Sequence, residues 1–350
     1  MVEPADQEFE QIVLCNERRA GLRSIIAIHD TSLGPALGGV RMRSYPSHDA
    51  AVADALALAR AMTYKAALAD LPIGGGKSVI NADPRSANRD EILMAHARYI
   101  SSLGGRYIPA VDMGTTVCDM RLIGRFAPLS CAQRVDPGLF TARGVVRSIE
   151  AALMHATGKG VDGRRVAVQG LGNVGWNVAR MLIEEGADVT AADIDEHKVA
   201  RGVEELGITP APLSRILDSD VDVLSPCAGG GVIDAAALDS LRAEVLVGAA
   251  NNMLSSNTIA VDLAERGIVY VPDFVANAGG LMAMEAELRD DETGLESKVD
   301  SIAATALAVL ERSAATNLDT VTVATEMART RVASSRTDQP YFAQAVTAGM

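Results

Sequence analysis

The hydrophobic and polar positions of the chain change period several times along its first half, and each period predicts a different element. Residues 22–30 (LRSIIAIHD) alternate like a β-strand, whereas residues 6–19 have helical character. Ser47 can cap an Ala/Leu-rich helix that continues to about Asp70. The patterns that follow predict a strand over 73–80, a helix over 89–103 and a strand over 106–111.

In the second half of the chain, predicted strands and helices alternate regularly and at shorter spacing. A helix is expected near 142–157, and the part of the chain from Gly279 onward is mostly helical in pattern. Between them the pattern predicts strand 164–169, helix 174–185, strand 188–192, helix 195–206, strand 221–225 and strand 244–249. Such alternation of strands and helices predicts a parallel, doubly wound α/β sheet.

Length and charge narrow the class of protein. The chain has 350 residues, of which 48% are hydrophobic, which suggests about two domains with buried cores. The formal net charge is −13 and no basic patch stands out, so no nucleic-acid partner is expected. No apolar run approaches the ~18 residues of a membrane span, and the N-terminus lacks the pattern of a secretory signal. We therefore expect no membrane association.

The cysteines give no sign of a metal site or of a disulfide framework. Cys15, Cys118, Cys131 and Cys227 lie far apart, and no C-x-x-C spacing occurs. No metal is expected, and a reducing cytoplasm is the location that fits this usage.

A glycine-rich turn in the second half predicts a dinucleotide site. The segment RRVAVQGLGNVG is a predicted strand followed by Gly170, Gly172 and Gly175 in G-x-G-x-x-G spacing, where a helix should begin. The first glycine permits the tight turn, the second lets the backbone approach a pyrophosphate, and the third lets the helix pack on the strand.

An acidic residue follows the next predicted strand. The segment ADVTAAD ends in Asp193, where a carboxylate can accept hydrogen bonds from a ribose 2′-hydroxyl group. Asp193 could instead be a solvated loop carboxylate, but its register with the glycines and the helix favours the dinucleotide site. Asp195 and Glu196 would repel a 2′-phosphate, so NAD is favoured over NADP.

A second glycine-rich segment, LPIGGGKSVI over 71–80, raises the question of a phosphate-binding P-loop. Gly76, Lys77 and Ser78 match the end of G-x-x-x-x-G-K-[ST], but Leu71 stands where the first glycine belongs. A strand rather than a helix is predicted after Lys77. What remains is a lysine beside a bare backbone that a ligand could approach, or else a glycine-rich turn with a solvated lysine.

Six segments stand out along the chain. They are GPALGGVRM (34–42), MTYKAALADLPIGGGKSVI (62–80), DMGTT (112–116), QGLGNVG (169–175), GAANN (248–252) and PDFVANAGG (272–280). Together, and in this order, they resemble the signature segments of the glutamate/leucine/phenylalanine/valine dehydrogenase family, most closely its leucine, valine and phenylalanine branch. The resemblance implies an N-terminal α/β substrate and oligomerisation domain over 1–135, on which a C-terminal helix over 325–350 packs. It also implies a Rossmann NAD-binding domain over 136–324, with a cleft between the two domains.

The resemblance also implies roles for individual residues. Oxidative deamination of an amino acid needs a group for the carboxylate, a base and a hydride acceptor. Lys65 corresponds to the carboxylate-binding lysine, Lys77 to the lysine that activates water, and Asp112 to the general acid/base. Two close lysines would disfavour protonation of each other, so the pKa of Lys77 could lie well below that of free lysine. Taken singly, Lys65 and Asp112 could also be a surface pair.

The remaining implied contacts fall into a substrate group and a cofactor group. The pocket would be lined by Gly38, Gly39, Leu37, Met62, Ala110, Asn251, Leu281 and Met284. NAD would contact Gly170, Gly172, Asn173, Val174, Gly175, Asp193, Thr141, Cys227, Ala228, Ala249 and Asn251. Read alone, Asn251 could be a polar cap at a strand end. The glycines of 74–76 are expected to make room for the substrate.

The substrate side chain is expected to be apolar. Glutamate-specific relatives carry a lysine where this chain has Leu37, and Leu37 cannot pair with a side-chain carboxylate. Leu281, Met284, Pro109 and Arg143 depart from the usual leucine-type pattern, so the preferred amino acid stays open.

The expectation is therefore an NAD-dependent, reversible oxidative deamination of an apolar L-amino acid, with branched-chain substrates first, to the 2-oxo acid, ammonia and NADH. A homo-oligomer, either a dimer or an octamer, is implied by the resemblance. The alternatives are a phenylalanine-preferring enzyme and a non-catalytic NAD-binding regulator. The presence of Lys65, Lys77 and Asp112 argues against the regulator.

Overall fold

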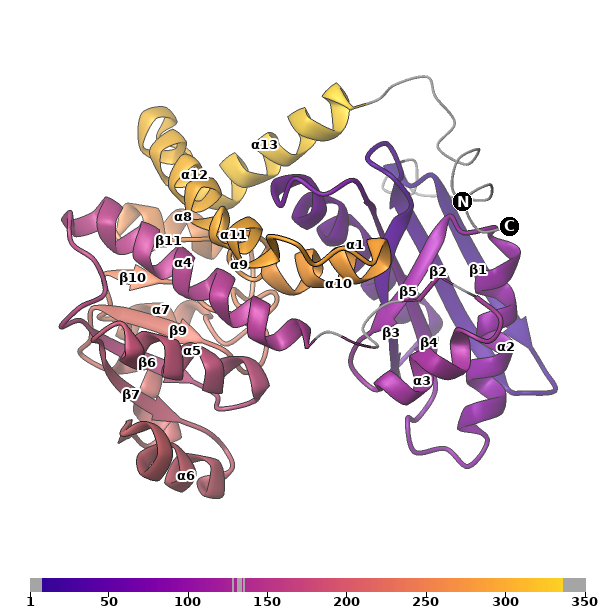
Figure 1. Cartoon of the computed structure of the whole chain (residues 1–350), viewed down its shortest axis with the longest axis horizontal. Coiled ribbons are helices and arrows are strands. Elements are labelled where there is room, and N and C mark those ends of the chain that lie inside the picture. Colours follow the sequence, from indigo (N-terminus) through magenta and orange to yellow (C-terminus); the bar gives the residue numbers. More distant parts are fainter. Residues whose placement is uncertain (1–7, 128, 131–133, 135, 336–350) are drawn as a thin grey trace. The chain divides into compact units, whose positions relative to one another are not determined.

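The computed structural model describes residues 8–127, 129–130, 134 and 136–335. These residues form two compact units, coloured along the chain in Figure 1. The described residues within 1–135, 284–292 and 328–350 make the first unit, and residues 136–283 and 293–327 make the second. No helix in these described ranges is both long and apolar enough to cross a membrane.

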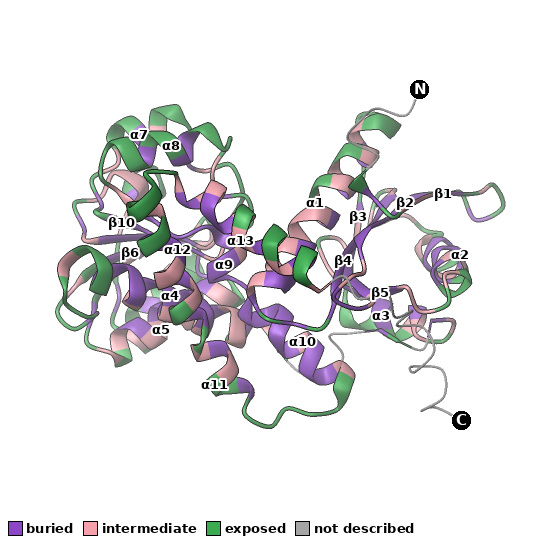
Figure 2. Ribbon diagram, turned by 90° about the horizontal axis from the view of Figure 1, so that it is seen from above, coloured by how far each residue is buried: buried purple, intermediate pink, exposed green. Residues whose placement is uncertain are grey.

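The first unit is built on a mixed sheet. Within the described residues its strands follow the order β1 (Gln11–Glu17), β2 (Leu22–Asp30), β4 (Gly74–Asn81), β3 (Ala36–Arg43) and β5 (Tyr107–Val111). β2 is antiparallel to both β1 and β4, whereas β3 is parallel to both β4 and β5. The predicted strands at 22–30, 73–80 and 106–111 are therefore confirmed, and β4 is buried along nearly its whole length (Figure 2).

Helices cover the two faces of this sheet. α1 (His48–Leu68) packs on one face through alanines at four-residue spacing, Ala51, Ala55 and Ala59. α2 (Arg89–Ser102) and α3 (Val117–Ile123) contribute to the core on the other face. The predicted cap of α1 is confirmed, since the Ser47 hydroxyl accepts the Ala50 N–H at 3.1 Å.

The helix expected over 6–19 is wrong. Residues Gln11–Glu17 form β1 instead, which pairs with β2 from Gln11 opposite Ile28 to Glu17 opposite Leu22. Gly21, at φ 71°, adopts the left-handed conformation in the turn between the strands. Backbone pairing with a strongly patterned neighbour decides the conformation of this edge segment, and that pairing overrides the weak local helical pattern.

The second unit contains a parallel sheet of the doubly wound type. Its described strands follow the order β11 (Val269–Tyr270), β10 (Val245–Leu246), β9 (Val223–Pro226), β6 (Arg165–Gln169), β7 (Asp188–Ala192) and β8 (Thr209–Pro210). Each of these strands is parallel to its neighbours in the sheet. The α/β alternation predicted from 164 onward is confirmed, while the two-residue strands β8 and β11 had too short a pattern to be predicted.

Helices connect these strands and fill the end of the chain. They are α4 (Pro137–Thr157), α5 (Asn173–Glu184), α6 (Glu196–Leu206), α7 (Ala235–Ser240), α8 (Thr258–Glu265), α9 (Asp273–Ala276), α10 (Gly279–Arg289), α11 (Leu295–Asp300), α12 (Ile302–Thr316) and α13 (Thr320–Ser334), with a 3₁₀ helix at Leu213–Asp218. α4 begins earlier than expected because Asp136 caps it through the Gly138 N–H. The helix expected over 325–350 coincides with α13 only at its start, and residues 336–350 lie outside the described residues.

Candidate active site

Three charged side chains from neighbouring strands meet on the face of the first sheet that α1 covers. Lys77 lies on β4, Arg41 on β3, and Asp112 directly follows β5. Lys77 Nζ is 2.6 Å from Asp112 Oδ2, and Arg41 Nε donates to the same oxygen at 3.0 Å. One carboxylate oxygen is thus shared by two cations.

Strand alternation explains why these residues share a face. Gly39 lies opposite Ala110 across β3 and β5, so two residues further along Arg41 and Asp112 reach the same side. The Asp112 N–H donates to the Thr115 hydroxyl at 3.0 Å, and that hydroxyl donates to the Val40 carbonyl at 2.8 Å. Thr115 therefore fixes the backbone that carries the carboxylate to the end of β3.

Burial sets the protonation behaviour of the pair. The Lys77 side chain is 7% exposed and that of Asp112 is 21% exposed. Burial lowers the pKa of Lys77; the negative charge of Asp112 opposes this, and the positive charge of Arg41 adds to it, so the net shift is downward. Burial alone would raise the pKa of Asp112, but the cations Lys77 and Arg41 outweigh it and lower the pKa. Asp112 is therefore a carboxylate at neutral pH, beside a lysine that loses its proton more readily than usual.

Two further residues hold the Arg41 guanidinium. Arg41 Nη1 lies 3.1 Å from Asp54 Oδ2, an oxygen that also accepts a hydrogen bond from the Tyr45 hydroxyl. Tyr45, Asp54, Arg41, Asp112 and Lys77 form one continuous polar chain. Neither Arg41 nor Asp54 was predicted as a site residue, although Arg41 stands two residues after Gly39 in GPALGGVRM and so shares its face.

The glycines around the site are required by the approach of the protein's own atoms. A Cβ atom at Gly39 would lie 2.6 Å from Asp112 Cβ and 3.1 Å from Lys77 Nζ. One at Gly38 would lie 1.7 Å from the Gly76 carbonyl oxygen, and one at Gly75 would lie 2.1 Å from the Thr63 nitrogen of α1. The expectation that the glycines of 74–76 make room for a substrate is corrected: they let β3, α1 and the Tyr107 ring pack against β4.

LPIGGGKSVI is therefore not a P-loop. Gly74–Asn81 is a buried strand that does not open into a helix, and Lys77 is buried against Asp112 rather than solvated. The strand excludes the P-loop, and the burial of Lys77 excludes a glycine-rich turn with a solvated lysine.

The other residues expected near the substrate in this unit are distributed over the same face and its helix. Leu37 is fully buried and lies opposite Gly75 and Ile108, and Ala110 lies opposite Gly39. Met62 and Lys65 are one turn apart near the end of α1 and are partly buried. Met284 is on α10.

The glycine-rich turn of the second unit has the geometry that a dinucleotide needs. Gly170 takes φ 96°, and a Cβ at Gly175 would lie 1.9 Å from the Gly170 carbonyl oxygen. Gly172 is the N-cap residue of α5, where no side chain caps the helix and a Cβ would meet open space. The start of α5 can therefore receive an anionic group, and the residues present fit a pyrophosphate.

Asp193 is held against this turn. Its Oδ2 accepts the Leu171 N–H at 2.6 Å and its Oδ1 accepts the Asp195 N–H at 2.9 Å. Asp193 is thus a structured carboxylate, not a solvated loop residue. It borders a pocket of about 580 Å³ formed with α6 and the segment 210–213, whose walls include Ile194, Val199 and Leu213. This pocket fits the adenosine end of a dinucleotide.

The other expected cofactor residues lie in the same unit with defined partners. Asn173 Nδ2 donates to the Asp136 carboxylate at 3.0 Å, and Thr141 Oγ1 donates to the Pro137 carbonyl at 2.7 Å. A Cβ at Gly170 would lie 2.9 Å from that of Ala228, whose neighbour Cys227 donates its N–H to Gln169. Val174 is in the first turn of α5, and Leu281 is buried on α10.

Sequence reasoning missed Asn277, which connects two of these positions. Its Nδ2 donates to the Ala249 carbonyl at 3.1 Å and to Asn251 Oδ1 at 2.9 Å. A signal was available in the sequence, because Asn277 lies in the segment PDFVANAGG. The structure adds that its side chain is buried. Asn277 thus orients the Asn251 amide.

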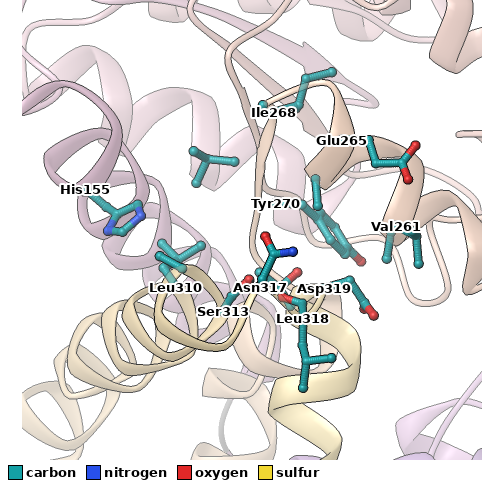
Figure 3. Close-up of a pocket in the computed structure, with 16 residues that line it drawn as sticks. His155, Val261, Glu265, Ile268, Tyr270, Leu310, Ser313, Asn317, Leu318 and Asp319 are labelled. Atoms are coloured by element: carbon teal, nitrogen blue, oxygen red, sulfur yellow. Dashed lines mark hydrogen bonds between the residues drawn. The ribbon is translucent and has the colours of Figure 1, made fainter.

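A second hollow of this unit carries none of the expected site residues. It has a volume of about 420 Å³ and lies between α8, β11 and the turn that joins α12 to α13 (Figure 3). Its polar groups bond one another: the Ser313 hydroxyl donates to the Leu318 carbonyl at 2.5 Å, and the Asp319 carboxylate accepts the Val321 N–H at 3.0 Å.

Comparisons with known proteins agree with this geometry. Residues 10–126 match the model of the Glu/Leu/Phe/Val dehydrogenase dimerisation domain, and residues 138–199 and 192–339 match the Glutamate/Leucine/Phenylalanine/Valine dehydrogenase model. The chain belongs to the Glu/Leu/Phe/Val dehydrogenase family. It is therefore an amino acid dehydrogenase, and the resemblance identified from its motifs is confirmed.

Individual members of the family match almost the whole chain. Leucine dehydrogenase of Bacillus subtilis is 42% identical over 346 residues, which cover 96% of this chain and 95% of that protein. Valine dehydrogenase of Streptomyces virginiae is 39% identical, covering 93% and 94%. The crystal structure of L-tryptophan dehydrogenase from Nostoc punctiforme superposes with a TM-score of 0.85 at 37% identity, covering 95% of this chain and 98% of that one.

Proposed function

We propose that this dehydrogenase catalyses the NAD-dependent, reversible oxidative deamination of an apolar L-amino acid, branched-chain substrates first, to the 2-oxo acid, ammonia and NADH. The observation that carries the proposal is the buried contact of 2.6 Å between Lys77 Nζ and Asp112 Oδ2. Burial lowers the pKa of Lys77 toward the working pH, and the adjacent Asp112 stays ionised, so the pair combines a lysine that can give up its proton with a carboxylate that can accept one.

The charged residues of the proposed site have distinct roles. Lys65 binds the substrate carboxylate, and Asp112 exchanges protons with the amino group. Bound NAD would supply the hydride acceptor for the substrate Cα atom. Lys77 takes a proton from the water that adds to the iminium carbon and stabilises the oxygen that becomes negative there. Asp112 returns a proton to the nitrogen, which leaves as ammonia, while the hydroxyl proton passes to solvent and the carbonyl group forms.

NAD is the proposed cofactor, in preference to NADP. The Asp193 carboxylate is suited to accept hydrogen bonds from the ribose hydroxyls, while its charge and those of Asp195 and Glu196 repel a 2′-phosphate. Lys198 Nζ lies 3.9 Å from Asp193 Oδ1 and offsets part of that charge. We expect a preference for NAD of about tenfold or more in kcat/KM, reduced by Asp193→Ala.

An apolar substrate side chain is supported by Leu37, which is fully buried on the face that carries Lys77. A glutamate side chain would find no cation at the position of Leu37, and an unpaired buried carboxylate costs several kcal/mol. The named relatives act on leucine, valine and tryptophan, so apolar amino acids of different size are all candidates. A phenylalanine preference remains the alternative.

A homo-oligomer, a dimer or an octamer, is proposed for the assembled enzyme. The match of residues 10–126 to a dimerisation domain supports it. Light scattering of the purified protein would measure the molar mass directly, and a monomer would contradict the proposal.

The test of the proposed function is a substrate panel. Purified protein is mixed with NAD or NADP and with leucine, isoleucine, valine, phenylalanine, tryptophan or glutamate, and nicotinamide reduction is followed by absorbance. We expect turnover of apolar amino acids with NAD and poor turnover of glutamate. Turnover of glutamate as fast as leucine would contradict the pocket, and no turnover of any amino acid would contradict the function.

A further inference from the structure

The Lys77–Asp112 pair is bound to a third charge that the proposed chemistry does not use. Arg41 Nε donates to the same Asp112 oxygen that Lys77 contacts, at 3.0 Å against 2.6 Å for Lys77. An arginine guanidinium stays protonated throughout the working pH range, whereas a lysine can lose its proton. Of the two cations on this oxygen, Lys77 is the one that can release a proton.

We propose that Arg41, held in place by Asp54, is a positioning residue that keeps Asp112 ionised and directed at Lys77, and so sets the pH range in which the pair works. The inference rests on the proposed function and adds to it the control of proton exchange at the same site. Arg41 and Asp54 act through Asp112 and Lys77 and are not assigned any contact with the substrate.

The charges around Lys77 alternate in sign. Asp112 attracts the lysine proton, Arg41 repels it, and Asp54 on α1 attracts it from behind Arg41. Because contacts with Asp112 and Asp54 hold the Arg41 guanidinium in place, its distance from the Lys77 amine is fixed. The Tyr45 hydroxyl completes the arrangement by donating to Asp54; burial and that bond raise the pKa of Tyr45, so it stays a donor.

The other elements around Lys77 add few titratable groups. β2 presents Ala27 opposite Lys77, with His29 and Asp30 toward the end of that strand. β3 presents Gly39 beside the Lys77 amine. α1, besides Asp54, carries Lys65. Besides Lys77 itself, Arg41 is the cation that contacts the shared Asp112 oxygen among the described groups.

The two outer residues therefore act on Lys77 with opposite signs. Removing the charge of Arg41 makes proton loss from Lys77 harder, whereas removing the charge of Asp54 makes it easier. Deamination needs the deprotonated amine, so the rate rises with pH as Lys77 loses its proton. Arg41→Gln should move the rising limb of the pH–kcat profile to higher pH, and Asp54→Asn should move it to lower pH.

The experiment measures this limb for wild type, Arg41→Gln, Arg41→Lys and Asp54→Asn on the best amino acid of the panel. We expect shifts of about 1 pH unit in opposite directions for Arg41→Gln and Asp54→Asn. Arg41→Lys keeps the charge and should return the limb toward the wild-type position. Ser78→Ala, next to Lys77 but on the other face of β4, is the control and should leave the limb in place.

A second readout does not depend on turnover. The rate at which acetic anhydride modifies the Lys77 amine, followed by mass spectrometry across pH, reports its deprotonated fraction and should shift in the same directions. If the wild type is active, the inference is overturned when the limbs of Arg41→Gln and Asp54→Asn stay at the wild-type position, or when both shift equally in the same direction. An inactive wild type would instead overturn the proposed function, while the labelling experiment would still decide the role of Arg41.

Discussion

The two faces of strands β3 and β4 bury opposite kinds of polar group, although alternating residues of the same segments build both. The face under α1 holds charges, with Lys77 and Arg41 on one Asp112 oxygen. On the other face, Ser78, the neighbour of Lys77, contacts the fully buried His96 of α2 through Nε2 at 3.0 Å.

The second face is a neutral network. His96 Nδ1 lies 2.9 Å from the Ser24 hydroxyl of β2, and the Tyr107 hydroxyl donates to the Gly38 carbonyl at 2.6 Å. Burial lowers the pKa of His96 to about 3, so the ring stays neutral at working pH. These hydrogen bonds join strands β2, β3, β4 and β5 to α2 without burying any charge.

The two faces of β3 and β4 differ in whether their buried polar groups carry charge. Neutral hydrogen bonds are the less costly way to connect buried strands, because a buried ion pair must offset the desolvation of both ions. Beside β3 and β4, the charged Lys77, Arg41 and Asp112 lie on the face where perturbed protonation serves the proposed chemistry. We therefore expect substitutions on the charged face to change mainly kcat and KM, and substitutions on the neutral face to change mainly the free energy of unfolding.

The largest expected effect comes from the charged face. Lys77→Ala and Asp112→Asn should each lower kcat by about two or more orders of magnitude, because each removes an acid/base or electrostatic group. NADH binding, measured by fluorescence, should stay intact and serves as the control for folding. Near-normal kcat in Lys77→Ala would end the assignment of this face to catalysis.

The neutral face should be sensitive to acid. The pKa of His96 is about 3 in the folded protein against an ordinary value of 6.5, so below pH 6.5 the unfolded state binds a proton that the folded state does not. Stability is thus lost as the pH falls from 6.5 toward 3. Between pH 7 and pH 5 this amounts to about 2 kcal/mol.

His96→Gln removes the titration and tests that expectation. Denaturant unfolding at pH 7 and pH 5 should show a smaller loss of stability in the variant than in wild type, by about 2 kcal/mol. If both proteins lose the same amount, His96 is not the acid-sensitive group of this face.

Lys65 lies on α1, the helix that covers the charged face, and its substitution should affect a different kinetic constant from that of Lys77. Lys65→Ala should raise KM for the amino acid by about tenfold or more, the scale of a lost charged hydrogen bond, with a smaller change in kcat. It should also lower discrimination against amines that lack a carboxylate. Steady-state kinetics separate the two constants, and a kcat loss equal to that of Lys77→Ala would reject the division of roles.

The smallest effect is expected from Ser78. Ser78→Ala leaves His96 Nε2 without its serine partner and should reduce stability by about 1 kcal/mol while kcat stays near wild type. Ser102→Ala, at an exposed hydroxyl at the end of α2, is the matched control and should change stability less. A large kcat loss in Ser78→Ala with unchanged stability would show that the faces are not separate in function.

Local patterns sufficed for much of the fold. The parallel alternation from 164 onward, the Ser47 cap and strand β4 follow from periodicity and turn residues, which act over a few positions. β1 was not predicted because an edge strand makes its inter-strand hydrogen bonds with a single neighbour, here β2, and residues 11–17 lack a strong pattern of their own.

The candidate site was predictable only in part. Lys65, Lys77 and Asp112 could be selected from motifs because each stands in a distinctive local segment. Arg41 also stands in such a segment, GPALGGVRM, but its contact with Asp54 on α1 could not be predicted, since nothing in the local sequence of either residue shows that they meet. The space beside Gly74, Gly75 and Gly76 was assigned to a ligand, whereas a Cβ there would meet atoms from β2, α1 and β5.

By itself, the sequence determined the family, the dinucleotide turn and the residue types needed for proton transfer, because glycine spacing, helix caps and alternating strands are local properties of a chain. The tertiary structure alone decided which cation shares the Asp112 oxygen with Lys77, and which polar groups stay neutral behind it. Those outcomes depend on the register of strands from distant segments and on burial, and Coulomb energies in a poorly solvated interior change steeply over a few ångströms.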